Sequence, residues 1–95
     1  MKWLETIKVQ TAIVQEHVVQ DNLISLTEEV RNSSDLAGLQ GVKPYQHGMM
    51  SGYFVIQLFW DTETPLKQAS MLGLQLKQTL RTFGLVDHTV WIEQM

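Results

Sequence analysis

The 95-residue sequence predicts a small α+β domain with the element order strand, helix, strand, strand, helix, strand. Residues 52–60 are almost all apolar, which is typical of a buried strand, whereas residues 66–83 carry apolar side chains at steps of three and four. After Gly84 the chain again reads as a strand, and a similar strand and helix precede residue 36. This order is the ferredoxin-like βαββαβ unit, an antiparallel four-stranded sheet with both helices on one face.

Length and composition favour one domain over residues 1–95 and exclude several classes of function. Charged residues make up only 18% of the chain, against a usual share of about 25%, so part of the surface is expected to be hidden against a partner. The net charge is -3 and the basic residues are scattered, which argues against nucleic acid. The chain has no cysteine and no histidines or carboxylates at the spacing of metal ligands, so no metal site is expected. It also has no run of about 20 apolar residues that could span a membrane, so we expect a cytoplasmic protein.

The first half of the chain predicts a strand, a helix and an edge strand. Residues 2–13 are rich in β-branched side chains, but Glu5 interrupts the apolar alternation and leaves the buried face undecided. The next segment carries an apolar stripe typical of a helix that starts near residues 15–16 or at a cap on Asp21 and ends at residues 32–35. The stripe consists of Val19, Leu23, Leu26 and Val30, widened by Ile24. Pro44 lacks an amide donor, so residues 36–47 are expected at a sheet edge, followed by a hairpin connection over 48–52.

Residues 53–61 form the strongest predicted strand, and apolar side chains occupy both of its faces. A strand that is apolar on both sides is covered on both sides. The helices can supply one cover, and 95 residues leave few candidates for the other. We therefore predict a homodimer that forms through the uncovered sheet face.

The last third predicts a helix over 66–83 and a closing strand over 88–94. Either Pro65 at the first helical position or a cap on Ser70 can start this helix. Gly73 is unfavourable inside a helix by about 1 kcal/mol, which indicates a close approach to the sheet. Gly84 is expected to end the helix as a C-terminal glycine.

The element order and the hydrophobic pattern, together with the run from Phe83 to Glu93, resemble the dimeric α/β-barrel superfamily, which includes antibiotic-biosynthesis-monooxygenase-like and stress-responsive A/B-barrel domains. The resemblance implies two ferredoxin-like subunits packed sheet to sheet, each with a pocket between its helices and its sheet. It also implies a function among cofactor-free oxygenases, haem-degrading enzymes, isomerases and proteins of other roles. Residues 65–83 contain no histidine to bind haem iron, so no cofactor is expected. Residues 2–13 lack the asparagine that the oxygenase branch often uses, whereas Trp60 or Trp91 can supply its tryptophan.

Several side chains are candidates for chemistry, and each also has a plainer structural interpretation. Tyr45 and His47 share one face of a strand, where His47 can carry a proton, although an exposed edge pair is the commoner arrangement. His88 can line a pocket mouth, but it points away from the face of its neighbour Asp87 in a strand. Three tryptophans, Trp3, Trp60 and Trp91, can form an aromatic cage or anchor the core and a dimer interface. Glu5 and Glu93 on adjoining terminal strands can form a carboxylate pair.

Two functions are compatible with these observations. The first is a protein that binds a small molecule between helices and sheet, either a cofactor-independent monooxygenase-like or an isomerase-like enzyme. Its candidate pocket residues are Tyr45, His47, Trp60, His88 and Trp91. The alternative is a non-catalytic, self-associating interaction or regulatory module, in which the apolar strand and the tryptophans only build a core and an interface.

Overall fold

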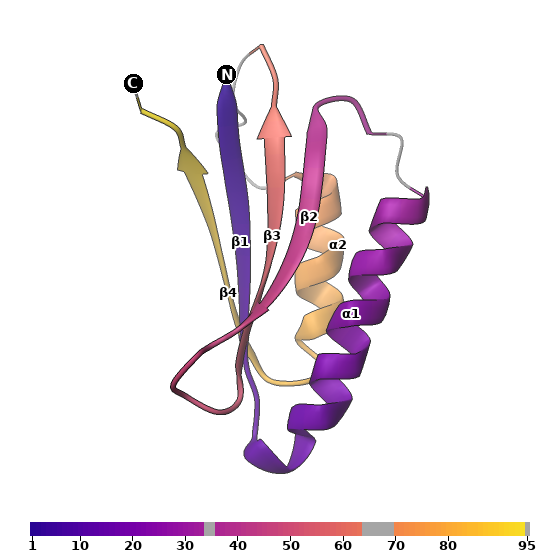
Figure 1. The fold of residues 1–95 in the computed structure, drawn as a ribbon, viewed down its shortest axis with the longest axis vertical. Helices are drawn as coiled ribbons and strands as arrows, with labels where there is room; N and C mark the ends of the chain where they lie inside the picture. The colour runs from indigo at the N-terminus through magenta and orange to yellow at the C-terminus, as the bar shows by residue number, and fades with distance from the viewer. Residues whose placement is uncertain (34–35, 64–69, 95) are drawn as a thin grey trace.

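The computed structural model describes residues 1–33, 36–63 and 70–94, and it confirms the predicted βαββαβ order. Both helices cover the same face of one four-stranded sheet (Figure 1). The two chain ends lie at the same end of the sheet, where the Glu93 amide donates to the Lys2 carbonyl. The elements are β1 (Lys2–Gln10), a 3-10 turn (Ile13–Gln15), α1 (Glu16–Ser33), β2 (Leu39–Gln46), β3 (Tyr53–Asp61), α2 (Met71–Leu80) and β4 (Leu85–Ile92).

The sheet is antiparallel throughout, with the strand order β2-β3-β1-β4. The two chain-terminal strands therefore pair with each other, and β1 lies between β3 and β4. Pro44 lies in β2, which is an edge strand as predicted. No strand pairs with the outer side of β2, so the missing amide of the proline loses no hydrogen bond there. β4 begins at Leu85, three residues before the predicted start at residue 88.

Alternation along β1 and β3 divides the sheet into a helix-covered face and an open face. In β1 the helix-covered positions are Trp3, Glu5, Ile7 and Val9, all buried. The face that the sequence left undecided is thus the odd-numbered one, and Glu5 lies on it. The other helix-covered residues of the core are Val42 on β2 and Phe54, Ile56, Leu58 and Trp60 on β3.

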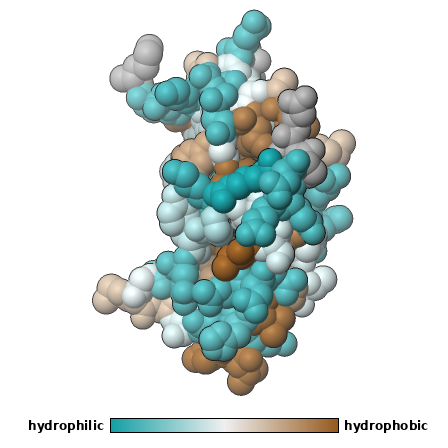
Figure 2. All heavy atoms as spheres, turned by 45° about the vertical axis from the view of Figure 1, so that its right-hand side comes forward, coloured by the Kyte–Doolittle hydropathy of each residue, from teal (hydrophilic) through white to brown (hydrophobic). Residues whose placement is uncertain are grey.

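Helix α1 buries most of the predicted stripe, namely Val19, Leu23 and Val30, with Leu26 packed against their edge. The prediction for Ile24 is wrong, because its side chain is 44% exposed. Thr27 takes the buried position instead, since its hydroxyl donates to the Leu23 carbonyl at 2.8 Å and leaves no unpaired polar group. Figure 2 brings the α1 side forward and shows hydrophilic residues over most of that face.

Helix α2 starts at Met71 with Ser70 as its N-cap, whose Oγ accepts from the Gly73 amide at 2.9 Å. The alternative start at Pro65 and the predicted first turn over 66–69 lie outside the described residues. The helix ends at Leu80 with Arg81 as its C-cap, three residues before the predicted end at residue 83, so Gly84 does not directly end it, and the φ of Gly84 is not positive. A side chain at Gly84 would instead strike the Gln10 carbonyl, so this glycine lets the chain pass close to β1.

The open face of the sheet carries side chains that the helices do not cover. Leu4, Val55 and Phe59 are half-buried there, while Tyr45 and Trp91 are exposed. No helix in the described parts of the chain is long and apolar enough to cross a membrane.

Candidate functional site

A buried carboxylate lies in the middle of the sheet. The Glu5 side chain is fully buried on the helix-covered face, where an ionised group is costly unless donors surround it. Three donors do so: Trp60 Nε1 lies 3.0 Å from Oε1, and the Ser70 amide and His88 Nε2 lie 3.1 Å and 2.7 Å from Oε2. These four residues, Glu5, Trp60, Ser70 and His88, are called the Glu5 cluster below.

The sheet register brings the cluster together. Trp60 lies on β3 opposite Trp3, and His88 lies on β4 opposite Ile7, so both reach Glu5 diagonally across β1. Ser70 adds the backbone N–H at the start of α2. The start of a helix carries partial positive charge, which favours an anionic carboxylate at this place.

Gly73 lets α2 approach the cluster closely, as its position in the sequence predicted. A Cβ at this position would collide with the Glu5 carboxylate and lie 3.0 Å from His88 Cε1. Every larger residue would push the helix away from the carboxylate. The first turn of α2 therefore rests directly on the Glu5–His88 pair.

The Glu5–His88 contact holds a proton between two side chains that solvent scarcely reaches. The side chains of His88 and Glu5 are 3% and 0% exposed, and a 2.7 Å separation of Nε2 and Oε2 requires a hydrogen between them. Either a neutral imidazole protonated on Nε2 or an imidazolium can supply it. Such a pair can accept a proton from a bound molecule and return it later.

The Trp60 indole connects the Glu5 cluster to a stacked aromatic pair. Its ring lies nearly parallel to that of Trp3, with a centroid distance of 5.3 Å and an interplanar angle of 9°. Trp3 Nε1 donates to the Thr62 hydroxyl at 2.9 Å. Both rings are buried, and their orientations are fixed by these polar contacts at their edges.

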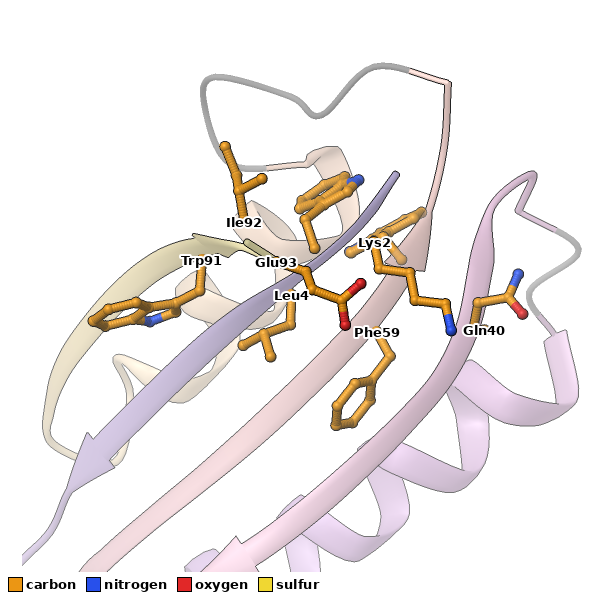
Figure 3. A pocket seen from close by; sticks show the side chains of 9 residues that line it. Lys2, Leu4, Gln40, Phe59, Trp91, Ile92 and Glu93 are labelled. Atoms are coloured by element: carbon orange, nitrogen blue, oxygen red, sulfur yellow. The ribbon is translucent and has the colours of Figure 1, made fainter. Parts of the chain in front are cut away.

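A cavity of about 480 Å³ opens at the end of the sheet where the chain termini lie, and we call it the end cavity. Its size falls within the range of small-molecule sites. Leu4 forms its centre, because it lies opposite Phe59 on one side and Trp91 on the other (Figure 3). The lining residues are Lys2, Trp3, Leu4, Gln40, Phe59, Trp60, Trp91, Ile92 and Glu93.

The predicted pocket residues fall into two groups. Trp60 and His88 meet at Glu5, and Trp60 also lines the end cavity together with Trp91. His47 lies apart from them, because its Nδ1 accepts the backbone N–H groups of Met49 and Met50 and so caps the β2–β3 turn. Tyr45 is equally remote, on the open face of the edge strand, where it lies opposite Val55.

Glu5 itself was expected in a different pairing. The expected partner was Glu93, but Glu93 is exposed at the chain end and the partner of Glu5 is His88. The sequence did contain one signal for the Glu5 cluster, because Glu5 interrupts the alternation of apolar side chains along β1. A carboxylate on a buried face must have donors, and this requirement points to histidines and tryptophans on the neighbouring strands.

Comparisons with known proteins find a likeness in structure alone. No family model and no curated protein matches the chain. Among solved structures, Rv0793 from Mycobacterium tuberculosis matches with a TM-score of 0.70 and 13% identity, over 100% of this chain and 97% of that one. A protein from Deinococcus radiodurans, provisionally named an antibiotic biosynthesis monooxygenase, matches with a TM-score of 0.66 and 11% identity, over 98% and 93%.

A third match is SnoaB from Streptomyces nogalater, described as a cofactor-independent oxygenase. Its TM-score is 0.53 at 11% identity, and the alignment covers 99% of this chain and 92% of that one. The chain has the fold of these full-length matches, which is the predicted ferredoxin-like βαββαβ fold. Identities of 11–13% show the fold and leave the activity to be argued from the site.

Proposed function

We propose that the protein is a homodimeric enzyme of the cofactor-independent oxygenase kind, which acts on a small aromatic molecule held against Trp60. The observation that carries this proposal is the buried Glu5–His88 pair, in which Oε2 and Nε2 lie 2.7 Å apart and the Trp60 indole contacts the same carboxylate. The fold shared with SnoaB supports the same class of reaction. The end cavity is not the proposed substrate site, because its central residue Leu4 lies on the open face, across the sheet from the Glu5–His88 pair.

The proposed reaction needs a base and dioxygen. The Glu5–His88 pair takes a proton from an acidic C–H or O–H group of an electron-rich phenol or its keto tautomer, which leaves a delocalised anion. The anion transfers one electron to dioxygen, and the two radicals combine and regain the proton as a hydroperoxide. Loss of water then leaves a carbonyl group, so one oxygen atom enters the substrate and the other leaves as water.

Oxygen consumption tests this proposal. A panel of hydroquinones and polycyclic phenols is offered to the protein and to the variants Glu5→Gln and His88→Gln, with exposed Glu28→Gln on α1 as the matched control. We expect turnover of at least one compound by the unchanged protein and the control. The two cluster variants should lose about 100-fold or more, because a positioned base contributes about 10²–10⁴-fold to such a step.

Two results would count against the enzyme. One is an absence of turnover across the panel, and the other is full activity in folded Glu5→Gln protein. Either would make the Glu5 cluster a support for α2 and favour the non-catalytic interaction module. Product analysis with labelled dioxygen separates incorporation of oxygen from simple oxidation of the substrate.

The homodimer is part of the proposal, because the open face needs a cover. Leu4, Val55 and Phe59 are half-buried on that face, and Trp91 is 61% exposed beside them. Leu4, Phe59 and Trp91 also line the end cavity, so the partner subunit would cover this cavity. Solvated aromatic and aliphatic side chains grouped on one face are typical of an interface. Sedimentation at several concentrations measures the subunit number.

A further inference from the structure

We propose that Trp60 is a redox-active tryptophan, which gives up one electron while its indole proton passes to Glu5. The inference is independent of the proposed oxygenase reaction and needs no substrate. It follows from two observations: the bond from Trp60 to a buried carboxylate and the stacking of Trp60 on Trp3.

The carboxylate makes oxidation of Trp60 favourable compared with an indole in an apolar site. Removal of an electron turns the indole into a cation whose N–H is strongly acidic. Glu5 Oε1 lies 3.0 Å from Trp60 Nε1 in a fully buried setting, so its negative charge stabilises the cation strongly. The same oxygen can accept the proton directly, with no water molecule needed.

The charge balance of the step also favours Trp60. The electron leaves to the oxidant, the proton moves from Nε1 to Oε1, and the products are a neutral indolyl radical and a neutral glutamic acid. A buried negative charge therefore disappears and no buried positive charge is created on these two residues. The new acid stays in place, because His88 and the Ser70 amide hold its other oxygen and its own proton points back to the indole nitrogen.

The stacked partner distinguishes Trp60 from an isolated indole. With ring centroids 5.3 Å apart and planes only 9° from parallel, Trp3 and Trp60 can share the positive charge before the proton moves. Trp3 donates its own N–H to the Thr62 hydroxyl, a neutral acceptor that binds a proton far less readily than a carboxylate. The radical is therefore expected to settle on Trp60.

Trp3 and Trp60 are among the residues that line the end cavity, but their side chains are buried on the helix-covered face, so the oxidant takes the electron from buried rings without direct contact. The class of oxidant is a one-electron acceptor of small size, such as a peroxyl radical or a photogenerated ruthenium(III) complex. The same cavity also contains a natural comparison. In the single subunit Trp91 is 61% exposed, and its Nε1 donates at 2.9 Å to the hydroxyl of Thr89, which is again a neutral acceptor.

Flash photolysis of two single-tryptophan proteins tests the proposal. One keeps Trp60 (Trp3→Phe with Trp91→Phe) and the other keeps Trp91 (Trp3→Phe with Trp60→Phe). Tris(bipyridine)ruthenium(II) and a cobalt(III) ammine generate the oxidant, and transient absorption distinguishes the indole cation from the neutral radical. We expect the neutral radical without a detectable cation from Trp60, and a longer-lived cation from Trp91.

The decisive variant adds Glu5→Gln to the protein that keeps Trp60. The amide oxygen still accepts the indole hydrogen bond but does not take the proton, so formation of the neutral radical should slow by about tenfold or more. An unchanged rate, or a Trp60 radical that behaves like that of Trp91, overturns the proposal. Circular dichroism checks that the variant is folded.

A second measurement covers the case in which Glu5→Gln does not fold. In the protein that keeps Trp60 and Glu5, deprotonation should not depend on buffer concentration, because the acceptor is internal. Deprotonation of Trp91 should accelerate as the buffer base is raised. Buffer-dependent deprotonation of Trp60 would overturn the assignment of Glu5 as the acceptor.

Discussion

Glu5 and His88 lie on adjacent antiparallel strands and share a 2.7 Å contact diagonally across the β1–β4 pairing, because His88 lies opposite Ile7. This contact joins the first strand to the last, and the Ser70 amide joins the same carboxylate to the start of α2. The Glu5 cluster is therefore a structural junction as well as the proposed reactive site. Its contributions to stability and to chemistry are separable by the choice of substitution.

Removal of the carboxylate should cost much stability. Glu5→Ala leaves the Trp60 indole N–H, the Ser70 amide and His88 without an acceptor and opens a cavity in the core. Loss of one partner from a buried charged network typically costs about 3–5 kcal/mol. Urea unfolding should show a loss of this size, whereas Glu28→Ala on the solvated face of α1 should stay within about 0.5 kcal/mol. Equal stability of the two variants would show that the buried contacts contribute little.

Gly73→Ala should destabilise the protein although alanine is the better helix former by about 1 kcal/mol. The added methyl group collides with the Glu5 carboxylate and crowds His88 Cε1 at 3.0 Å, so α2 must shift. Overpacking of this kind costs about 1–3 kcal/mol, which we expect as a lower unfolding free energy in urea. Gly48→Ala is the control, because no atom lies within 4 Å of the place that its methyl group would take and its φ is not positive. A stabilised Gly73→Ala protein would contradict the close approach of α2.

The arrangement of strands and helices could be predicted from hydrophobic periodicity, because each element buries one face within a window of about ten to twenty residues. The end of α1 near residues 32–35 and the edge position of Pro44 follow from equally local chemistry. Ile24 shows the limit of the method. It lies at the edge of the apolar stripe and stays exposed, whereas Thr27 is buried by its spacing between Leu23 and Val30 and satisfies its hydroxyl with the Leu23 carbonyl.

The candidate site could be predicted only in part, because its contacts join residues far apart in the chain. Glu5 meets Trp60, Ser70 and His88 across 55, 65 and 83 residues, and such distances leave no periodic trace in the sequence. Trp60 and His88 could be chosen as candidates from their residue types alone. Glu5, the acceptor that both of them contact, was marked in the sequence only by its interruption of the apolar alternation in the first strand. His47 was chosen by the same reasoning from type, and its ring caps a turn instead.

The N-cap of α2 should contribute measurably to the stability of the helix start that contacts Glu5. Ser70→Ala removes the Oγ that accepts from the Gly73 amide at 2.9 Å, while it keeps the backbone N–H that donates to Glu5. We expect a loss of about 1 kcal/mol, as for other N-cap deletions. Hydrogen exchange should show faster opening of the first turn of α2, whereas β1–β3 amides change little. Unchanged exchange in that turn would mean that Glu5 alone fixes the helix start.

The open face gives the last prediction, which concerns assembly. Val55 lies in the centre of that face, half-buried beside Tyr45, and its replacement by lysine would place an unpaired charge inside a sheet-to-sheet interface. A cost of about 3 kcal/mol corresponds to about a 100-fold rise in the dimer dissociation constant. Met71→Lys is the control, because this side chain is exposed on α2 and away from the sheet. Analytical ultracentrifugation should find the control still dimeric and Val55→Lys monomeric but folded. A dimer that survives Val55→Lys unchanged would place the interface elsewhere.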